Sequence, residues 1–288
     1  MPFKSQTKLW SSELSVAQDI YTEVRKDCGF KESAGSWVTP PAGSHKFSHT
    51  LFPTYGWSGL PNTLSTRMAK DLGLLNKYPS LRGLNTCGNN STECTKLCIN
   101  LSGSGVYPAV QKSRLARTIV FAEFFEASLY LTMNAIDKML KKHTDVAYRP
   151  DVFTDTRWED KYPELFNMYP TVNFYGYTKH WDRVPNPAPN YSLTFSADER
   201  RSLSEIRNKV SQGHNVAVVV DIKSKTPKPD IWAGMNAVDG DDPIRGDSRF
   251  LDAKGVVVLL SPKGKARHLK HRNSKFIWPV NPELNGRG

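Results

Sequence analysis

Three cysteines lie close together in the chain, in the pattern Cys87-x6-Cys94-x3-Cys98. Thiolates are soft ligands, and they suit zinc or an iron–sulfur cluster. Three of them are what a 4Fe–4S cluster needs when one iron stays open for a substrate or for S-adenosylmethionine. A structural zinc site usually has four protein ligands, and the fourth would have to come from a distance, from Cys28, His45 or His49. The spacing therefore favours a 4Fe–4S cluster, with zinc as the alternative.

A glycine-rich turn, Ser102-Gly103-Ser104-Gly105, follows the third cysteine. Because glycine has no Cβ, its backbone can approach a bound group closely. Gly103 and Gly105 are therefore candidate cofactor-binding residues. Two other interpretations of the cysteines stay open. They are buried, inert thiols that pack as small hydrophobic residues, or they form a redox disulfide, which is rare in the cytosol.

Five short apolar segments predict the strands of the fold. They cover residues 146–149, 171–175, 191–195, 216–220 and 256–260, and the last two are continuous apolar runs typical of strands buried on both faces. Helical patterns at 63–74, 109–142 and 197–213 alternate with these strands. In the last helix, Ser196 is the expected N-cap and Gly213 the stop. This alternation indicates an α/β fold with a parallel sheet, either open or closed into a barrel.

Polar side chains follow several of the predicted strands. In parallel α/β proteins the carboxyl ends of the strands line the active site. We therefore expect Arg149, Asp155, Tyr177 and Lys179 to line the substrate side, with the two cations binding an anionic group and Asp155 binding a hydroxyl or an amine. Ser196 is a candidate for cofactor binding. The alternative is a structural ion-pair network at the mouth of the sheet.

The positive charge is concentrated near the end of the chain. The 288 residues carry a formal net charge of +11, and residues 263–275 contain six Lys and Arg with no acid. Such a run can contact phosphates, so Lys263, Lys265 and Arg267 are candidate nucleic-acid contacts. The alternative is a solvated basic tail that aids solubility.

Composition limits the compartment and divides the chain. The N-terminus has no apolar segment of the kind found in signal peptides, and no apolar run is long enough to span a membrane. We expect a cytoplasmic protein without a membrane partner. A helical pattern at 9–25 and a loop-rich stretch make residues 1–50 an N-terminal extension, followed by a domain at 51–280 and a tail at 281–288.

An ordered set of motifs resembles the gene-product-88-like proteins of bacteriophages, over about residues 51–278. The loop NTCGNNSTECTKLCINLSGSG resembles the family's Cys-x6-Cys-x3-Cys-Leu pattern, with Ile99 where Leu is usual and Gly88 where Pro is usual. YRPDVFTDTRWED resembles a family motif in which Asp151 stands where Asn is usual. FYGYTK resembles another, with Gly176 in place of an acid. The segments VQKSRLART, LTFSADE and LSPKGKA also match.

The resemblance implies a phage protein that acts in the host cytoplasm. A further similarity links phage proteins with clustered cysteines before a βα series to radical S-adenosylmethionine enzymes, although the spacing here departs from their usual Cys-x3-Cys-x2-Cys. It implies a partial or complete β/α barrel with a 4Fe–4S cluster at the strand ends and a small-molecule or nucleotide-like, phosphate-bearing substrate. The alternative is a nucleic-acid-binding replication or host-takeover protein with structural zinc.

Overall fold

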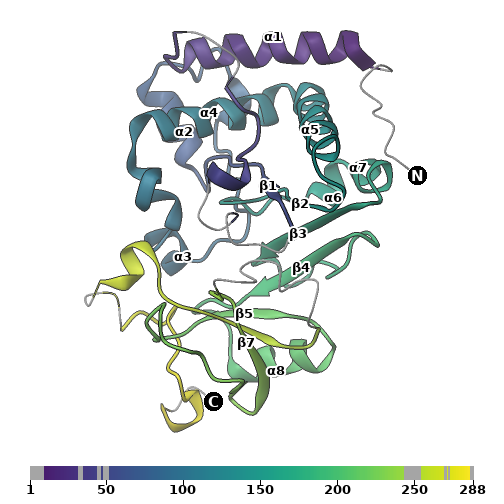
Figure 1. The fold of residues 1–288 in the computed structure, drawn as a ribbon. Coiled ribbons are helices and arrows are strands. Elements are labelled where there is room, and N and C mark those ends of the chain that lie inside the picture. Colours follow the sequence, from purple (N-terminus) through teal and green to yellow (C-terminus); the bar gives the residue numbers. More distant parts are fainter. Residues whose placement is uncertain are drawn as a thin grey trace.

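Eight strands form one sheet, in the order β1-β2-β3-β4-β5-β8-β7-β6 (Figure 1). The structure is a computed structural model, and it describes residues 10–31, 35–43, 47, 52–242, 254–268, 271 and 273–285. The strands are β1 (Thr54–Gly56), β2 (Val146–Arg149), β3 (Val172–Thr178), β4 (Tyr191–Ser196), β5 (Val216–Val219), β6 (Ile231–Trp232), β7 (Met235–Asp239) and β8 (Val257–Leu260). The five predicted strands are confirmed as β2, β3, β4, β5 and β8.

The strand pairs are parallel except at one edge. In the order of the sheet, each neighbouring pair from β1 through β5 and β8 to β7 is parallel, whereas β6 at the edge is antiparallel to β7. A two-residue turn joins β6 and β7, and Ala233 and Gly234 both have positive φ there, as a tight hairpin requires. Among the described residues the sheet stays open between β1 and β6, so the fold is α/β with a mostly parallel sheet and not a closed barrel.

Eight α-helices are present in the described part of the chain. They are α1 (Ser11–Asp27), α2 (Leu64–Asp71), α3 (Thr92–Lys96), α4 (Pro108–Glu123), α5 (Phe125–Leu140), α6 (Trp158–Lys161), α7 (Pro163–Met168) and α8 (Leu203–Ser211). The predicted helices at 9–25 and 63–74 correspond to α1 and α2. No helix among the described residues is long and apolar enough to cross a membrane.

One predicted helix is divided and another begins later than expected. The long helix at 109–142 breaks at Phe124, where tertiary contacts override helical propensity: Phe124 packs edge-on against Tyr78, and Phe125 stacks on Tyr162. The helix expected at 197–213 begins only at Leu203. Its N-cap is Ser202, which forms a capping box with Glu205, so the assignment of Ser196 as N-cap was wrong. Gly213 does end the helix, with a φ of +84°.

The main helices pack on one side of the sheet. Strand register aligns Tyr148, Phe174 and Tyr191, which lie in the hydrophobic cluster formed with α1, α4 and α5. Phe195 and Val216 continue the same face into a second cluster that contains residues of α8. In Figure 1 the helices α1, α4 and α5 stack together beside β1–β3, and α8 lies by β5 and β7. The other face of the sheet is therefore left to smaller elements and loops.

Candidate functional site

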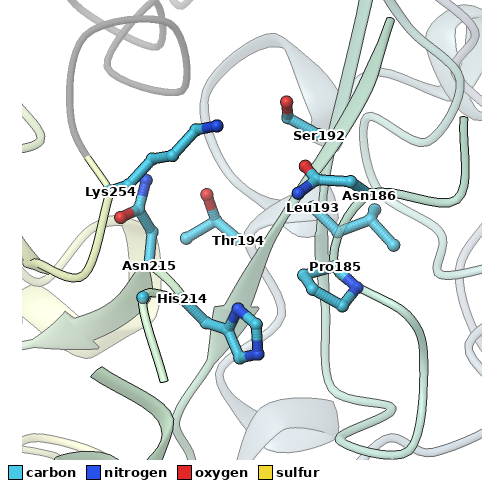
Figure 2. A pocket seen from close by; sticks show the side chains of 9 residues that line it. Pro185, Asn186, Ser192, Leu193, Thr194, His214, Asn215 and Lys254 are labelled. Carbon is cyan, nitrogen blue, oxygen red and sulfur yellow. The ribbon is translucent and has the colours of Figure 1, made fainter. Parts of the chain in front are cut away.

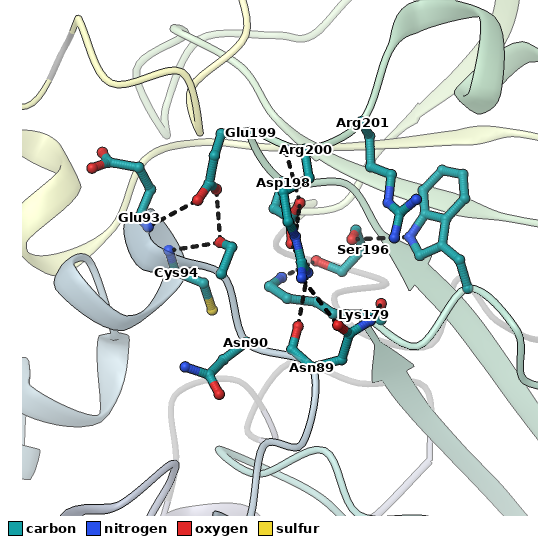
Figure 3. A network of polar contacts seen from close by, with 12 residues as sticks. Asn89, Asn90, Glu93, Cys94, Lys179, Ser196, Asp198, Glu199, Arg200 and Arg201 are labelled. Carbon is teal, nitrogen blue, oxygen red and sulfur yellow. Dashed lines mark hydrogen bonds and ion pairs between the residues drawn. The ribbon is translucent and has the colours of Figure 1, made fainter.

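The cysteine loop, residues 87–98, is attached to the carboxyl ends of β3 and β4 (Figure 3). Asn89 links the two: its Nδ2 donates a 2.6 Å hydrogen bond to the carbonyl of Lys179, and its own side-chain and backbone oxygens accept from Arg200 at 3.0 and 2.7 Å. Arg200 is held in turn by the buried carboxylate of Asp198 at 2.6 Å. Burial alone would raise the pKa of Asp198, but the hydrogen bonds from Arg200 lower it.

Glu199, which follows β4, binds the start of α3, the helix that carries Cys94. Its two carboxylate oxygens accept hydrogen bonds from the Ser91 hydroxyl at 2.7 Å and from the backbone N–H of Glu93 at 3.0 Å. Ser91 is the N-cap of α3, and its hydroxyl accepts from the Cys94 N–H at 3.1 Å. The position of Cys94 is therefore set by a residue that follows β4.

The three clustered thiols share one electrostatic neighbourhood. Burial raises the pKa of Cys87, and charge on Cys94 and Cys98 would raise it further. Burial also raises the pKa of Cys98, and charge on Cys94 adds to that shift. As the side chains stand, no three His, Cys, Asp or Glu residues of the described chain are close enough to hold a metal ion. The three soft donors thus lie within range of one another's charge, and their donor chemistry fits an iron–sulfur cluster or zinc.

The positive charge of Lys179 acts on two of these thiols, Cys94 and Cys98. Burial raises the pKa of Cys94, and the positive charge of Lys179 opposes this shift. The ammonium group donates a 2.8 Å hydrogen bond to Ser196 Oγ and lies 5.3 Å from the ring centroid of Phe276. Ser196 therefore ends β4 and orients Lys179. The predicted residues Lys179 and Ser196 are brought together beside the predicted cysteine loop.

Asp155 belongs to a buried ion-pair network. Its carboxylate accepts the backbone N–H of Lys179 at 2.7 Å and pairs with Arg183 at 3.0 Å. Arg183 also pairs with Glu159 at 2.7 Å, and its side chain is 1% exposed. Burial raises the pKa of Asp155, and the bonds from Lys179 and Arg183 oppose that shift. This geometry makes Asp155 a support for the end of β3.

Arg149 and Tyr177 lie together on the face of the sheet opposite the main helices. The Arg149 guanidinium donates to the carbonyl of Asp151 at 2.8 Å and lies 4.9 Å from the ring centroid of Tyr177. Tyr177 packs with Phe52, Ala147 and Tyr175 in a small cluster. Much of the hydrogen-bonding capacity of Arg149 is thus used within the loop that follows β2.

Arg114 supports the loop after the third cysteine and was not among the predicted site residues. Its guanidinium donates to the Asn100 carbonyl at 3.1 Å and lies 4.0 Å from the ring centroid of Phe153. Burial lowers the pKa of Arg114 to about 10, while charge on Cys98 would raise it. The signal available in the sequence was its place in the motif VQKSRLART.

The two glycines of the turn play different parts. A Cβ on Gly105 would lie 2.0 Å from the Asn100 carbonyl oxygen, so the backbone approaches itself closely there. Gly103 has a φ of +55° with open space around it. Both glycines therefore shape the loop that carries Cys98.

The possible fourth ligands lie elsewhere or outside the described residues. Cys28 is fully buried in the main hydrophobic cluster, and burial raises its pKa to about 12. His45 and His49 lie outside the described residues. Neither Glu199 nor Arg200 was predicted as a site residue, although both lie shortly after the predicted strand at 191–195.

The basic segment packs beside the cysteine loop. A Cβ on Gly264 would lie 2.7 Å from Ser102 Cβ, and the short 3-10 helix η7 (Gly264–Arg267) contacts η4 (Ile99–Leu101). Lys263 pairs with Asp241 at 2.6 Å, whereas Lys265 and Arg267 are exposed. Of the three predicted nucleic-acid contacts, one is therefore occupied within the protein.

Two pockets lie at opposite ends of the strands. The pocket of Figure 2 is at the amino ends, between Thr194, His214 and Lys254, and its volume of about 30 Å³ suits one water molecule. The other, of about 340 Å³, opens between α3 and the segment at 271–275. Of these two pockets, the one beside α3, which carries Cys94, therefore has room for a ligand.

Comparison with known proteins gives one match. A family model described as Gene product 88 matches residues 59–280. No curated protein matches the chain, and no solved structure does. The matched span contains the cysteine loop, β2–β8 and the residues that attach the loop to the sheet.

Proposed function

This chain belongs to the Gene product 88 family of phage proteins, and we propose that it is an enzyme that carries a 4Fe–4S cluster on Cys87, Cys94 and Cys98. The observation that carries the proposal is that these three thiols lie within range of one another's charge, on a loop bonded to the carboxyl ends of parallel strands. When bound, a cluster with three protein ligands supplies an open iron for S-adenosylmethionine or another small ligand. The reducing host cytoplasm, where thiols persist, is the compartment we propose.

The protein's own groups would prepare this site in two ways. Burial keeps the three thiols protonated at neutral pH, so loading releases protons and becomes easier as the pH rises. Lys179, held by Ser196, places a positive charge beside Cys94 and Cys98. That charge offsets the negative charge of the ligated thiolates and offers a contact for an anionic, phosphate-bearing substrate.

The predicted substrate residues take separate roles in this proposal. Lys179 would touch the anionic group of the substrate. Asp155 is a positioning residue, because it holds the backbone of Lys179 and the side chain of Arg183. Arg149 and Tyr177 would line the face of the sheet that the main helices leave uncovered.

We propose that the sheet is a partial β/α barrel of the radical S-adenosylmethionine kind. Strands β1 to β5 follow one another in chain order and are all parallel. The helices pack on one face, as on the outer wall of a barrel, whereas a doubly wound sheet carries helices on both faces. This support concerns architecture, and function rests on the thiols.

Metal analysis of protein purified without oxygen tests the proposal. We expect a brown protein with about four irons and four sulfides per chain. Replacing Cys87, Cys94 or Cys98 by Ala should remove the colour, whereas the matched variant Cys28→Ala should keep it, because Cys28 lies in the hydrophobic core. A colourless protein with one tightly bound zinc per chain would overturn the cluster.

A second candidate function is nucleic-acid binding with structural zinc on the same thiols. The packing of η7 against the cysteine loop favours it, because a metal there would stabilise a basic surface. The metal analysis separates the two candidates: zinc supports this one, and iron with sulfide supports the enzyme.

A further inference from the structure

A small hydrophobic cluster joins three separate segments of the chain. Leu97 follows α3, Ala266 lies in η7, and Ile277 lies in the C-terminal segment, and all three are buried against one another. Because these three residues pack against one another, their exposed neighbours in the chain border one region of the surface. That surface adjoins the cysteine loop, since Leu97 lies directly before Cys98.

The residues beside the anchors are cations. Lys96 precedes Leu97, Lys265 and Arg267 flank Ala266, and Lys275 lies two residues before Ile277; all four are exposed. We call this set of four the cationic rim. In the part of the chain that the structure describes, Lys265 and Lys275 have no carboxylate partner, and Lys96 pairs only with Glu93, at 3.4 Å. Most of the positive charge of the rim therefore faces solvent.

Lys263 shows the contrast within the same segment. Its ammonium lies 2.6 Å from Asp241, a carboxylate that also pairs with the buried Lys228 at 3.1 Å and accepts the N–H of Ser261. Charge on Lys263 is thus already balanced inside the protein. The rim, and not the whole basic run, is available to an anion.

The pocket of about 340 Å³ opens within this rim. Lys96 and Lys275 line it, together with Glu93 and Glu199. Both carboxylates are occupied by the protein. Glu199 accepts from Ser91 and from the backbone of Glu93, and Glu93 accepts from the Ser274 hydroxyl and from Lys96. Of the two lysines that line the pocket, Lys275 is therefore left to meet a ligand, while Lys96 is shared with Glu93 at 3.4 Å.

The arrangement suits a polyanion better than one small phosphate. A single phosphate needs donors that converge in an enclosed site, whereas these cations come from three segments and each is exposed. Repeated phosphates along a strand are matched by such a row of separate contacts. We propose that a single-stranded nucleic acid binds along the cationic rim and passes the mouth of the thiol site. This proposal names the substrate class of the proposed enzyme. The role of the nucleic acid as substrate rests on that proposed function.

Fluorescence anisotropy with a labelled single-stranded thymidine oligonucleotide tests the binding, on metal-free protein over a series of salt concentrations. We expect measurable binding that weakens as salt rises. The triple variant Lys265→Gln, Arg267→Gln, Lys275→Gln should bind more weakly, with a log–log salt slope smaller by about 2, since each contact with a single strand contributes about 0.7.

Two control variants make the result specific. The triple variant Lys138→Gln, Lys141→Gln, Lys142→Gln removes the same charge from exposed positions at the end of α5, away from α3 and η7 in Figure 1, and Lys263→Gln removes a cation that is already paired. Both should keep the slope of the unmodified protein. Circular dichroism should confirm that each variant is folded.

Three results would overturn the proposal that nucleic acid binds the cationic rim. They are no binding by the unmodified chain at low salt, an equal loss in the α5 variant, and equal binding of a polyglutamate peptide, which would show a general anion surface. Because the assay uses metal-free protein, its outcome is independent of the iron and sulfide analysis. The proposal of nucleic-acid binding and the proposal of an iron–sulfur cluster can therefore be refuted separately.

Discussion

The carboxylate of Glu199 accepts a 2.7 Å hydrogen bond from the hydroxyl of Ser91, and this contact ties the end of β4 to the N-cap of the helix that carries Cys94. The two residues are far apart in sequence, and only the fold makes them neighbours. The same carboxylate accepts the N–H of Glu93. The placement of Cys94 therefore depends on a residue that follows β4.

Replacing Glu199 by Gln should loosen the cysteine loop. The amide keeps one acceptor but loses the charge, and the second oxygen is replaced by a donor that faces the Ser91 hydroxyl or the Glu93 N–H. We expect a loss of about 1–3 kcal/mol in the free energy of unfolding and faster alkylation of Cys94 in metal-free protein. The matched control is Glu205→Gln in the capping box of α8. This control should lower the free energy of unfolding without changing the alkylation rate of Cys94. Equal alkylation rates in the two variants would contradict the role of the Glu199–Ser91 contact in placing Cys94.

Gly105 and Gly103 should respond differently to Ala. A Cβ at Gly105 meets the Asn100 carbonyl oxygen at 2.0 Å, so the backbone itself must move, at a cost of about 2–4 kcal/mol. A Cβ at Gly103 meets open space but carries the strain of a positive φ, of about 1 kcal/mol. Thermal unfolding of the two variants gives the comparison. A Gly105→Ala protein as stable as Gly103→Ala would show that the turn is not packed as described.

The pH dependence of thiol alkylation should report the charge on Lys179. Burial raises the pKa of Cys94 and of Cys98, and the Lys179 ammonium opposes both shifts. In Lys179→Met that opposition is lost, so both pKa values rise and the alkylation midpoint moves to higher pH. Peptide mass spectrometry after timed alkylation of metal-free protein measures it. Cys87 is the internal control, and an equal shift at Cys87, or none at Cys94, would argue against this placement of the cation.

Asp151 should make the folded state less stable as the pH rises. Burial raises the pKa of Asp151 to about 6, against about 3.9 in an unfolded chain. Between about pH 4 and 6 the folded protein keeps a proton that the unfolded chain has released, so the free energy of unfolding falls across that window.

The variant Asp151→Asn removes this titration and keeps an oxygen for the hydroxyls of Thr154 and Thr156, which bond Asp151. Denaturant unfolding between pH 4 and 7 should lose a pH-dependent change on the order of 1–3 kcal/mol. Asp145→Asn, at an exposed position, is the control and should leave the curve unchanged. A pH profile of Asp151→Asn that matches the unmodified protein would refute the assignment.

Local patterns in the sequence were sufficient for the strands and for several helices. Val216–Val219 and Val257–Leu260 are apolar throughout, and they pair as central parallel strands because only a sheet covered on both faces hides such runs. The helix α1 and the stop at Gly213 were also readable, because periodicity and a glycine in the left-handed region act within a few residues.

Long-range contacts overrode local patterns elsewhere. Ser196 looks like an N-cap from its neighbours alone, yet it stays in β4 and accepts from Lys179, while Ala197 bonds Ala217 of the next strand. No proline or glycine lies near Phe124, so the sequence carries no local signal for the helix break there. Lys263 looks as free as Lys265 until Asp241 is placed beside it.

The sequence by itself determined that three thiols lie within twelve residues of the chain. Only the tertiary structure decided what surrounds them: Lys179 and Glu199 come from the ends of two strands, Arg114 from a helix, and the cationic rim from three segments joined by Leu97, Ala266 and Ile277. The physical reason is range. Turn chemistry and periodicity act over a few residues, whereas charge pairing and burial depend on which distant segments the sheet brings to one edge.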